Sequence, residues 1–128
     1  MQNSGLSPMK YVADFRYDFA KDGGAVGDIE LGPYLPVNAI ITSGMIHVET
    51  AATSGGSATV ALKVNTAEDV LAATAVGSLT LNALLDVVPV GTAATAIRTT
   101  ALKKLTMTIA TATLTAGKIR VVLEYYLG

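Results

Sequence analysis

The stretch that decides the fold is the last strand of the chain, Lys118-Ile119-Arg120-Val121-Val122-Leu123-Glu124-Tyr125-Tyr126. One set of alternate side chains in this stretch is apolar, and the other set is mostly charged. Alternate side chains of a β-strand point to opposite faces of a sheet, so the pattern predicts a strand with one buried face and one face in water. The same alternation covers residues 10–19, where the apolar set is Tyr11, Ala13, Phe15, Tyr17 and Phe19.

Most of the sequence between these two segments predicts more short strands joined by glycine-rich turns. We expect the additional strands over residues 25–31, 39–50, 57–64, 78–82, 84–90, 96–100 and 105–113. We expect hairpin turns at 20–24 and 53–57, a loop at 32–36, a bulge or bend at Gly44, a helical turn at 68–73 and a turn at 115–118. The chain is therefore predicted to be all-β, an antiparallel β-sandwich of about eight strands that is jelly-roll-like.

The 128 residues suffice for one domain, which we place at residues 10–128 as a single β-sandwich. Residues 1–9 are polar and contain Gly5 and Pro8, so we predict a flexible N-terminal arm. This start of the chain has neither the basic region nor the apolar region of a signal peptide. We therefore expect the protein to be made and folded in a cytoplasm.

The composition is apolar and poor in charge. Charged residues make up 15% of the chain, against about 25% in ordinary globular proteins. Mean hydropathy is +0.49, yet no stretch approaches the roughly 18 uncharged apolar residues of a membrane-spanning helix. We expect no membrane association, and we expect the apolar excess to be buried in contacts between subunits, which are depleted of charge.

Several classes of function are disfavoured by the residues that the chain lacks. The net charge is −1 and Lys103-Lys104 is the only adjacent basic pair, which disfavours nucleic-acid binding. There is no cysteine, and His47 is the only histidine, beside Met45 and Glu49 on one strand face. The glycine-rich segments 22–24 and 54–57 lack the spacing of phosphate-binding loops. We therefore expect no enzyme activity, no cofactor and no metal.

Four carboxylates, Asp14, Asp18, Asp22 and Asp28, occupy the first predicted hairpin. Carboxylates beside a glycine-rich loop can bind Ca²⁺, but this spacing is not that of an EF-hand. Arg16 lies among them and neutralises part of their charge. We interpret them as a solvated strand face, with a calcium site as the alternative.

The five tyrosines divide between core and surface. Alternation places Tyr11, Tyr17 and Tyr125 on inward faces. Tyr34 lies in the predicted loop and Tyr126 points outward, so these two are predicted to meet a ligand or a neighbouring subunit.

Several segments resemble small virion proteins of tailed bacteriophages. They are Tyr17-Asp18-Phe19-Ala20-Lys21-Asp22-Gly23-Gly24-Ala25-Val26-Gly27-Asp28-Ile29-Glu30-Leu31-Gly32, Thr53-Ser54-Gly55-Gly56-Ser57-Ala58-Thr59-Val60-Ala61-Leu62, Pro89-Val90-Gly91-Thr92-Ala93 and Leu114-Thr115-Ala116-Gly117-Lys118. The similarity covers most of residues 11–127 and is to the group that includes capsid decoration (cement) proteins. The resemblance implies a β-sandwich homotrimer on the outer capsid, clamping neighbouring major capsid subunits. It carries no active site.

We therefore expect a structural virion protein on the outer capsid surface, whose partners are further copies of itself and the major capsid protein. The arm at residues 1–9 and the loops 32–38 and 91–95 are the predicted contact regions. The contact residues that we predict are Leu6, Pro8, Met9, Pro33, Tyr34, Leu35, Pro36 and Tyr126. The alternative is a head-spike or tail component that binds a host-surface glycan.

Overall fold

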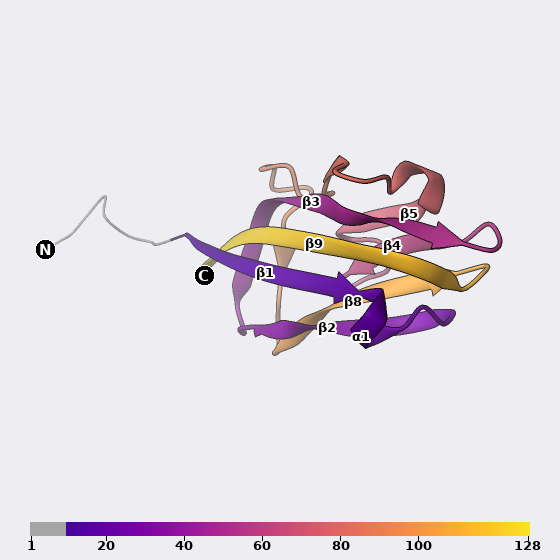
Figure 1. The fold of residues 1–128 in the computed structure, drawn as a ribbon. Coiled ribbons are helices and arrows are strands. Elements are labelled where there is room, and N and C mark those ends of the chain that lie inside the picture. Colours follow the sequence, from indigo (N-terminus) through magenta and orange to yellow (C-terminus); the bar gives the residue numbers. More distant parts are fainter. Residues whose placement is uncertain (1–9) are drawn as a thin grey trace, which may run out of the picture.

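A computed structural model describes residues 10–128 of the chain. They form two antiparallel sheets packed face to face (Figure 1). The first sheet contains β1 (Tyr11–Asp18), β3 (Ala39–Ser54), β6 (Leu84–Asp86), β7 (Ile97–Arg98) and β9 (Leu114–Leu127). The second contains β2 (Gly27–Leu35), β4 (Thr59–Lys63), β5 (Leu71–Ala75) and β8 (Lys103–Ala110). The two short helices are α1 (Phe19–Asp22) and the 3-10 helix η1 (Val76–Ser78).

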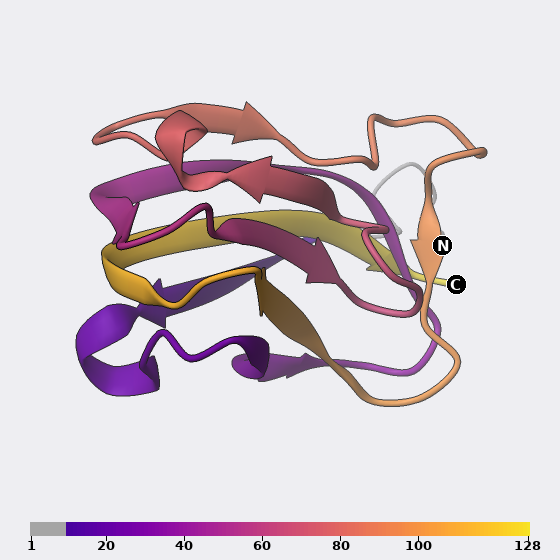
Figure 2. The same cartoon turned by 90° about the vertical axis from the view of Figure 1, so that its right-hand side faces the viewer.

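The strand order confirms the predicted all-β antiparallel sandwich. The first sheet runs β1-β9-β3-β6, with β7 also paired to β3, and the second runs β2-β8-β4-β5. The chain crosses from one sheet to the other at every connection except those between β4 and β5 and between β6 and β7 (Figure 2). Such interleaving of two four-strand paths supports the jelly-roll form of the sandwich. Residues 10–128 form nine strands, because β7 pairs with β3 in addition to the four-strand path of the first sheet.

The core is built from the inward sets of the alternating strands. In β8, the inward residues Leu105, Met107 and Ile109 are all buried, as predicted. The same is true of the inward residues of β9, which are Ile119, Val121 and Leu123. Burial of apolar side chains contributes about 25 cal/mol per Å² removed from water, so aliphatic residues supply most of the stabilisation here.

Two connections differ from the sequence prediction. Residues 20–24 and 53–57 were expected to close hairpins, but each carries the chain from one sheet to the other. The first of them contains α1, which is capped by the Asp18 carboxylate accepting from the Ala20 amide at 3.0 Å. Gly23 then takes a φ of 78°, which favours glycine. The glycine-rich sequence thus predicted a turn at this position correctly, but it did not predict which strands the flanking strands pair with.

Three further expectations are wrong. Residues 68–73 do not form a helical turn, because the chain enters β5 at Leu71. The segment 78–82 is not a strand, because Ser78 ends η1 and residues 81–82 form a turn. The reversal expected at 115–118 lies earlier, at residues 111–113, where Thr111 has a φ of 76°.

Strand β2 continues through the loop expected at 32–36, as far as Leu35. This is possible because β2 is an edge strand and residues 32–34 form no pairs with β8, so the missing N–H of Pro33 breaks no ladder hydrogen bond. The bulge expected at Gly44 is displaced. The register between β3 and β9 shifts between Ile41 and Ser43, immediately before the glycine.

Candidate interaction surfaces

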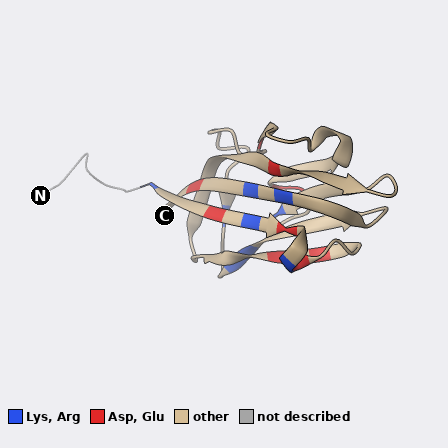
Figure 3. Cartoon of the chain, viewed as in Figure 1, with Lys and Arg blue, Asp and Glu red and all other residues tan. Residues whose placement is uncertain are grey.

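The outer face of the first sheet carries a network of ion pairs. Figure 3 shows the charged residues of both signs on β1, β9 and β3. Arg16 and Arg120 lie directly opposite each other on β1 and β9, a pairing that is repulsive by itself. Arg120 donates two hydrogen bonds of 3.0 Å to the Asp14 carboxylate, and Arg16 lies 3.4 Å from a carboxylate oxygen of Glu49. The hydrogen bonds to Asp14, together with its charge, raise the pKa of Arg120 above its usual range. The charges of this face are therefore largely compensated within the molecule.

A second surface is an apolar strip along the edge of the sandwich at β6. We define it by four exposed side chains, Leu81, Leu84, Val88 and Val90. The strip follows β3, because the Val48 amide donates to the Ala83 carbonyl and the Gly91 amide donates to the Thr42 carbonyl. Asp86 is the only charged residue of the whole segment 70–97.

A third surface is an apolar corner at the end of the sandwich where β2, β8 and β9 meet. We define it by the exposed side chains Tyr34, Val37, Leu102 and Leu127. The Lys104 ammonium lies over the ring of Tyr34, 4.8 Å from its centroid. One face of that ring is therefore already covered.

The corner is held in place by Thr99, which is fully buried. Its hydroxyl donates to the Pro36 carbonyl at 2.6 Å and accepts from the Ala39 amide at 2.9 Å. The Gly128 amide donates to the Asn38 carbonyl at 2.9 Å, which fixes the end of β9 against the same turn. The connection between β2 and β3 is thus anchored from both sides.

The corner gathers several of the predicted contact residues. Pro33 and Tyr34 are exposed there, Pro36 is half-buried, and Tyr126 is half-buried on the outer face of β9. Leu35 is a correction: it faces inward and is fully buried, so it belongs to the core and offers no surface contact. The other three predicted contact residues, Leu6, Pro8 and Met9, lie outside the described residues.

The tyrosines largely follow the predicted alternation. Tyr17 is buried, and its hydroxyl donates to the Gly23 carbonyl. Desolvation, followed by the nearby charges of Asp22 and Asp18, raises the pKa of Tyr17 to about 12. Tyr11 stacks on Tyr125 at 5.6 Å between ring centroids, but it remains exposed because it lies at the end of the inner face.

The four carboxylates of the first predicted hairpin do not come together at one site. Asp14 contacts the arginines, Asp18 caps α1, and the Asp22 carboxylate accepts from the Asp18 amide. Asp28 accepts from the Thr108 hydroxyl and lies 3.6 Å from the Lys63 ammonium. Within residues 10–128, no three His, Cys, Asp or Glu side chains are placed to hold a metal ion.

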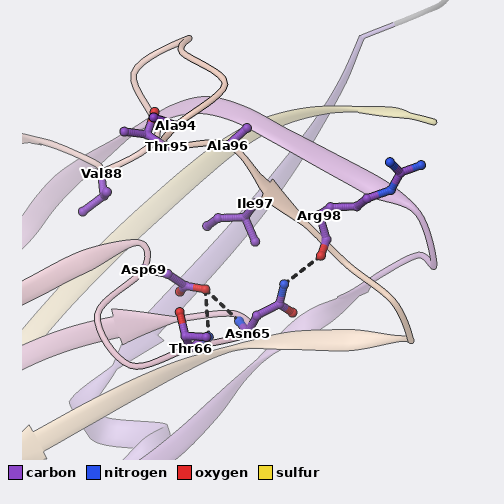
Figure 4. A pocket seen from close by; sticks show the side chains of 9 residues that line it. All are labelled: Asn65, Thr66, Asp69, Val88, Ala94, Thr95, Ala96, Ile97 and Arg98. Atoms are coloured by element: carbon purple, nitrogen blue, oxygen red, sulfur yellow. Dashed lines mark hydrogen bonds between the residues drawn. The ribbon is translucent and has the colours of Figure 1, made fainter.

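A hollow of about 300 Å³ lies between the 65–69 loop and the segment that leads into β7 (Figure 4). Its carboxylate, Asp69, accepts from the amides of Val64, Asn65 and Thr66 at 2.7–3.0 Å. The Asn65 side-chain amide donates to the Arg98 carbonyl at 2.7 Å. These polar groups are engaged in holding the loop, and no nucleophile and base meet here.

The remaining candidate residue is His47. His47 lies half-buried on the outer face, in the same cross-strand row as Arg120 and Leu84. None of the helices in the described part is long and apolar enough to span a bilayer. Sequence reasoning missed the strip, although the nearly uncharged run 70–97 was a signal that could have located it.

Comparison with solved structures finds this fold in bacteriophage capsids. A chain of the cyanophage Pam1 capsid asymmetric unit matches with a TM-score of 0.70 at 18% identity, over 100% of this chain and 91% of that chain. A chain of the acidic stable capsid of Helicobacter pylori bacteriophage KHP30 matches at 0.58, with 17% identity, over 94% and 89%. A chain of the capsid of Ralstonia phage GP4 matches at 0.59, with 22% identity, over 91% and 84%.

No protein-family model matches the chain, and no curated protein matches it in sequence. The relationship therefore rests on three-dimensional form. The described residues share the fold of chains found in three phage capsids.

Proposed function

We propose that this chain is a structural protein of the phage virion, and specifically a capsid decoration protein that binds the outer capsid lattice as a homotrimer and stabilises the head. The observation that carries the proposal is the size of the matched chains. The alignments cover 84–91% of those chains, so each has nearly the length of this one. A chain this small fits an accessory component better than the subunit that builds the shell.

The surfaces fit such a role. The charges on the outer face of the first sheet are paired with one another, whereas most of the exposed large apolar side chains belong to the strip or the corner. Contiguous exposed apolar side chains mark sites of association with other proteins. Contacts with further copies and with the major capsid protein would remove them from water.

The mechanism that we propose is mechanical. A protein that binds the assembled lattice and not its free subunits stabilises the lattice by mass action. A trimer that contacts several capsid subunits at once gains from multivalency, so each contact can be modest. Synthesis in the host cytoplasm followed by addition to the finished head is consistent with this mechanism.

The test is reconstitution. Purified protein is incubated with capsids that lack it, the capsids are sedimented, and the bound protein is quantified. We expect saturable binding at a fixed ratio to the major capsid protein and a higher melting temperature of the capsid. A matched control is provided by unexpanded precursor shells, on which we expect weaker binding. Binding to tails or host polysaccharide, with none to heads, would contradict the proposal and favour the glycan-binding alternative.

A further inference from the structure

We propose that the trimer closes head to tail, with the apolar strip of one copy packed against the apolar corner of the next. This inference rests on the homotrimer of the proposed function and names its interface. Two features of the described residues carry it: the separation of the two apolar surfaces, and the charges beside them.

The side chains of the strip are strongly exposed. Leu84 is 66% exposed, Leu81 is 63% exposed and Val90 is 61% exposed. These are high values for leucine and valine in strands or tight turns. Since segment 70–97 contains a single charge, the whole edge has the composition of a subunit interface.

The corner is also apolar, and hydrogen bonds hold its backbone in place. Leu102 is 62% exposed and Tyr34 is 60% exposed. The Thr99 hydroxyl fixes the turn beside them through hydrogen bonds at both Pro36 and Ala39. A surface that is already ordered loses little conformational entropy when it binds.

The two surfaces are separate patches of the molecule. Figure 2 shows β6 along the upper edge, and the β2–β3 and β7–β8 connections at the lower right. A two-fold dimer uses the same patch on both copies and would leave the second surface exposed. A three-membered ring must join two different patches, and strip and corner are two such patches with the same chemistry.

The charges beside the two surfaces are complementary. Asp86, in the strip, makes no ion pair with any residue of the described part of the chain. At the corner, Lys103 likewise has no carboxylate partner among residues 10–128, and Lys104 contacts the ring of Tyr34. Head-to-tail packing brings the lone carboxylate of the strip towards these two ammonium groups.

The test uses one variant on each surface and a matched control. Leu84→Asp alters the strip and Leu102→Asp alters the corner. Val26→Asp makes the same kind of change at a 55% exposed site at the far end, outside both surfaces. Molar mass is measured by size-exclusion chromatography with light scattering. We expect the wild type and Val26→Asp to be trimers, and the other two variants to associate at least about tenfold more weakly and run as monomers.

Mixing the two variants gives the decisive measurement. Leu84→Asp keeps an intact corner, and Leu102→Asp keeps an intact strip. In the mixture, the intact strip of Leu102→Asp can pack against the intact corner of Leu84→Asp, and no other intact pair exists. We therefore expect a one-to-one heterodimer that does not close into a ring. Homodimers of either variant alone, or a mixture that stays monomeric although both variants are folded by circular dichroism, would overturn the inference.

A charge exchange provides a second test that spares the apolar contacts. Asp86→Lys and Lys104→Asp are each expected to weaken the trimer, and the double variant is expected to restore it. A double variant no better than either single variant would count against the pairing. A wild type that is monomeric yet binds capsids would overturn this inference and leave the capsid-binding proposal standing.

Discussion

The backbone of β9 lies directly against Gly44 of β3. A Cβ at this position would collide with the Val122 carbonyl oxygen and the Leu123 side chain. We predict that Gly44→Ala destabilises the protein by about 1–3 kcal/mol, because either the two central strands or the side chain must move. Gly55→Ala is the matched control, since a Cβ there meets nothing within 4 Å, and its effect should stay within about 0.5 kcal/mol. Urea denaturation measures both.

Tyr17 gives the molecule a dependence on alkaline pH. Its pKa of about 12 in the folded state exceeds the ordinary value of 10.0, so the unfolded chain loses the phenol proton first. The resulting stabilisation is complete below pH 10 and is lost as the pH rises from 10 towards 12. We predict a steeper fall in unfolding free energy over this range for the wild type than for Tyr17→Phe. Equal slopes would show that Tyr17 titrates normally.

At the scale of the elements, Thr99 joins the β2–β3 turn to the segment after β7. We predict that Thr99→Val, which has nearly the same shape, costs about 1–3 kcal/mol of stability, because the Ala39 amide and the Pro36 carbonyl lose their partner. Thr99→Ser retains the hydroxyl and should lose much less. Thermal denaturation of the two variants side by side checks this, and equal losses would contradict the hydrogen-bonding role.

Asp69 holds the loop between β4 and β5 through three backbone amides. We predict that Asp69→Ala destabilises the protein by about 1–2 kcal/mol and speeds hydrogen exchange at the amides of Val64, Asn65 and Thr66. Asp69→Asn keeps one acceptor oxygen and should fall between the wild type and Asp69→Ala. Unchanged exchange at these three amides would show that the carboxylate does not order the loop.

The alternating strands could be predicted from sequence because alternation is a local property. Strands β4, β8 and β9 bury the side chains that the pattern assigns to the core. Alternation could not show whether the connections at 20–24 and 53–57 close hairpins. Glycine-rich turns reverse the chain, but they do not determine whether the next strand joins the same sheet or the facing one. The helical turn expected at 68–73 does not form. The Asp69 carboxylate instead accepts hydrogen bonds from amides that precede it in the chain, such as that of Val64.

The candidate surfaces were predictable only in part. The loop around Pro33 and Tyr34 was found because prolines and an aromatic residue in a turn indicate an exposed site. Leu35 was misplaced because the edge strand β2 extends through it and turns its side chain inward. The strip was missed because strands were expected over 78–82 and 84–90, whereas only three residues, Leu84–Asp86, pair there with β3.

At the scale of the whole molecule, the proposed trimer links stability to concentration. Subunits that associate only when folded stabilise one another, so the melting temperature should rise with protein concentration. We predict such a rise for the wild type and for Val26→Asp, and none for Leu84→Asp. Differential scanning calorimetry over a hundredfold range of concentration checks this. A melting temperature that is independent of concentration in the wild type would argue against the trimer.

The described chain begins and ends at the same extremity of the sandwich, since Tyr11 pairs with Tyr125 and the Gly128 amide reaches the turn at Asn38 (Figure 1). A cargo genetically fused to Gly128 would therefore stand beside the corner and crowd it. The β3–β4 connection, which contains Gly55 and Gly56, lies at the opposite extremity, where an inserted epitope would stand away from the corner. For displaying peptides on a particle, the internal insertion is the better position.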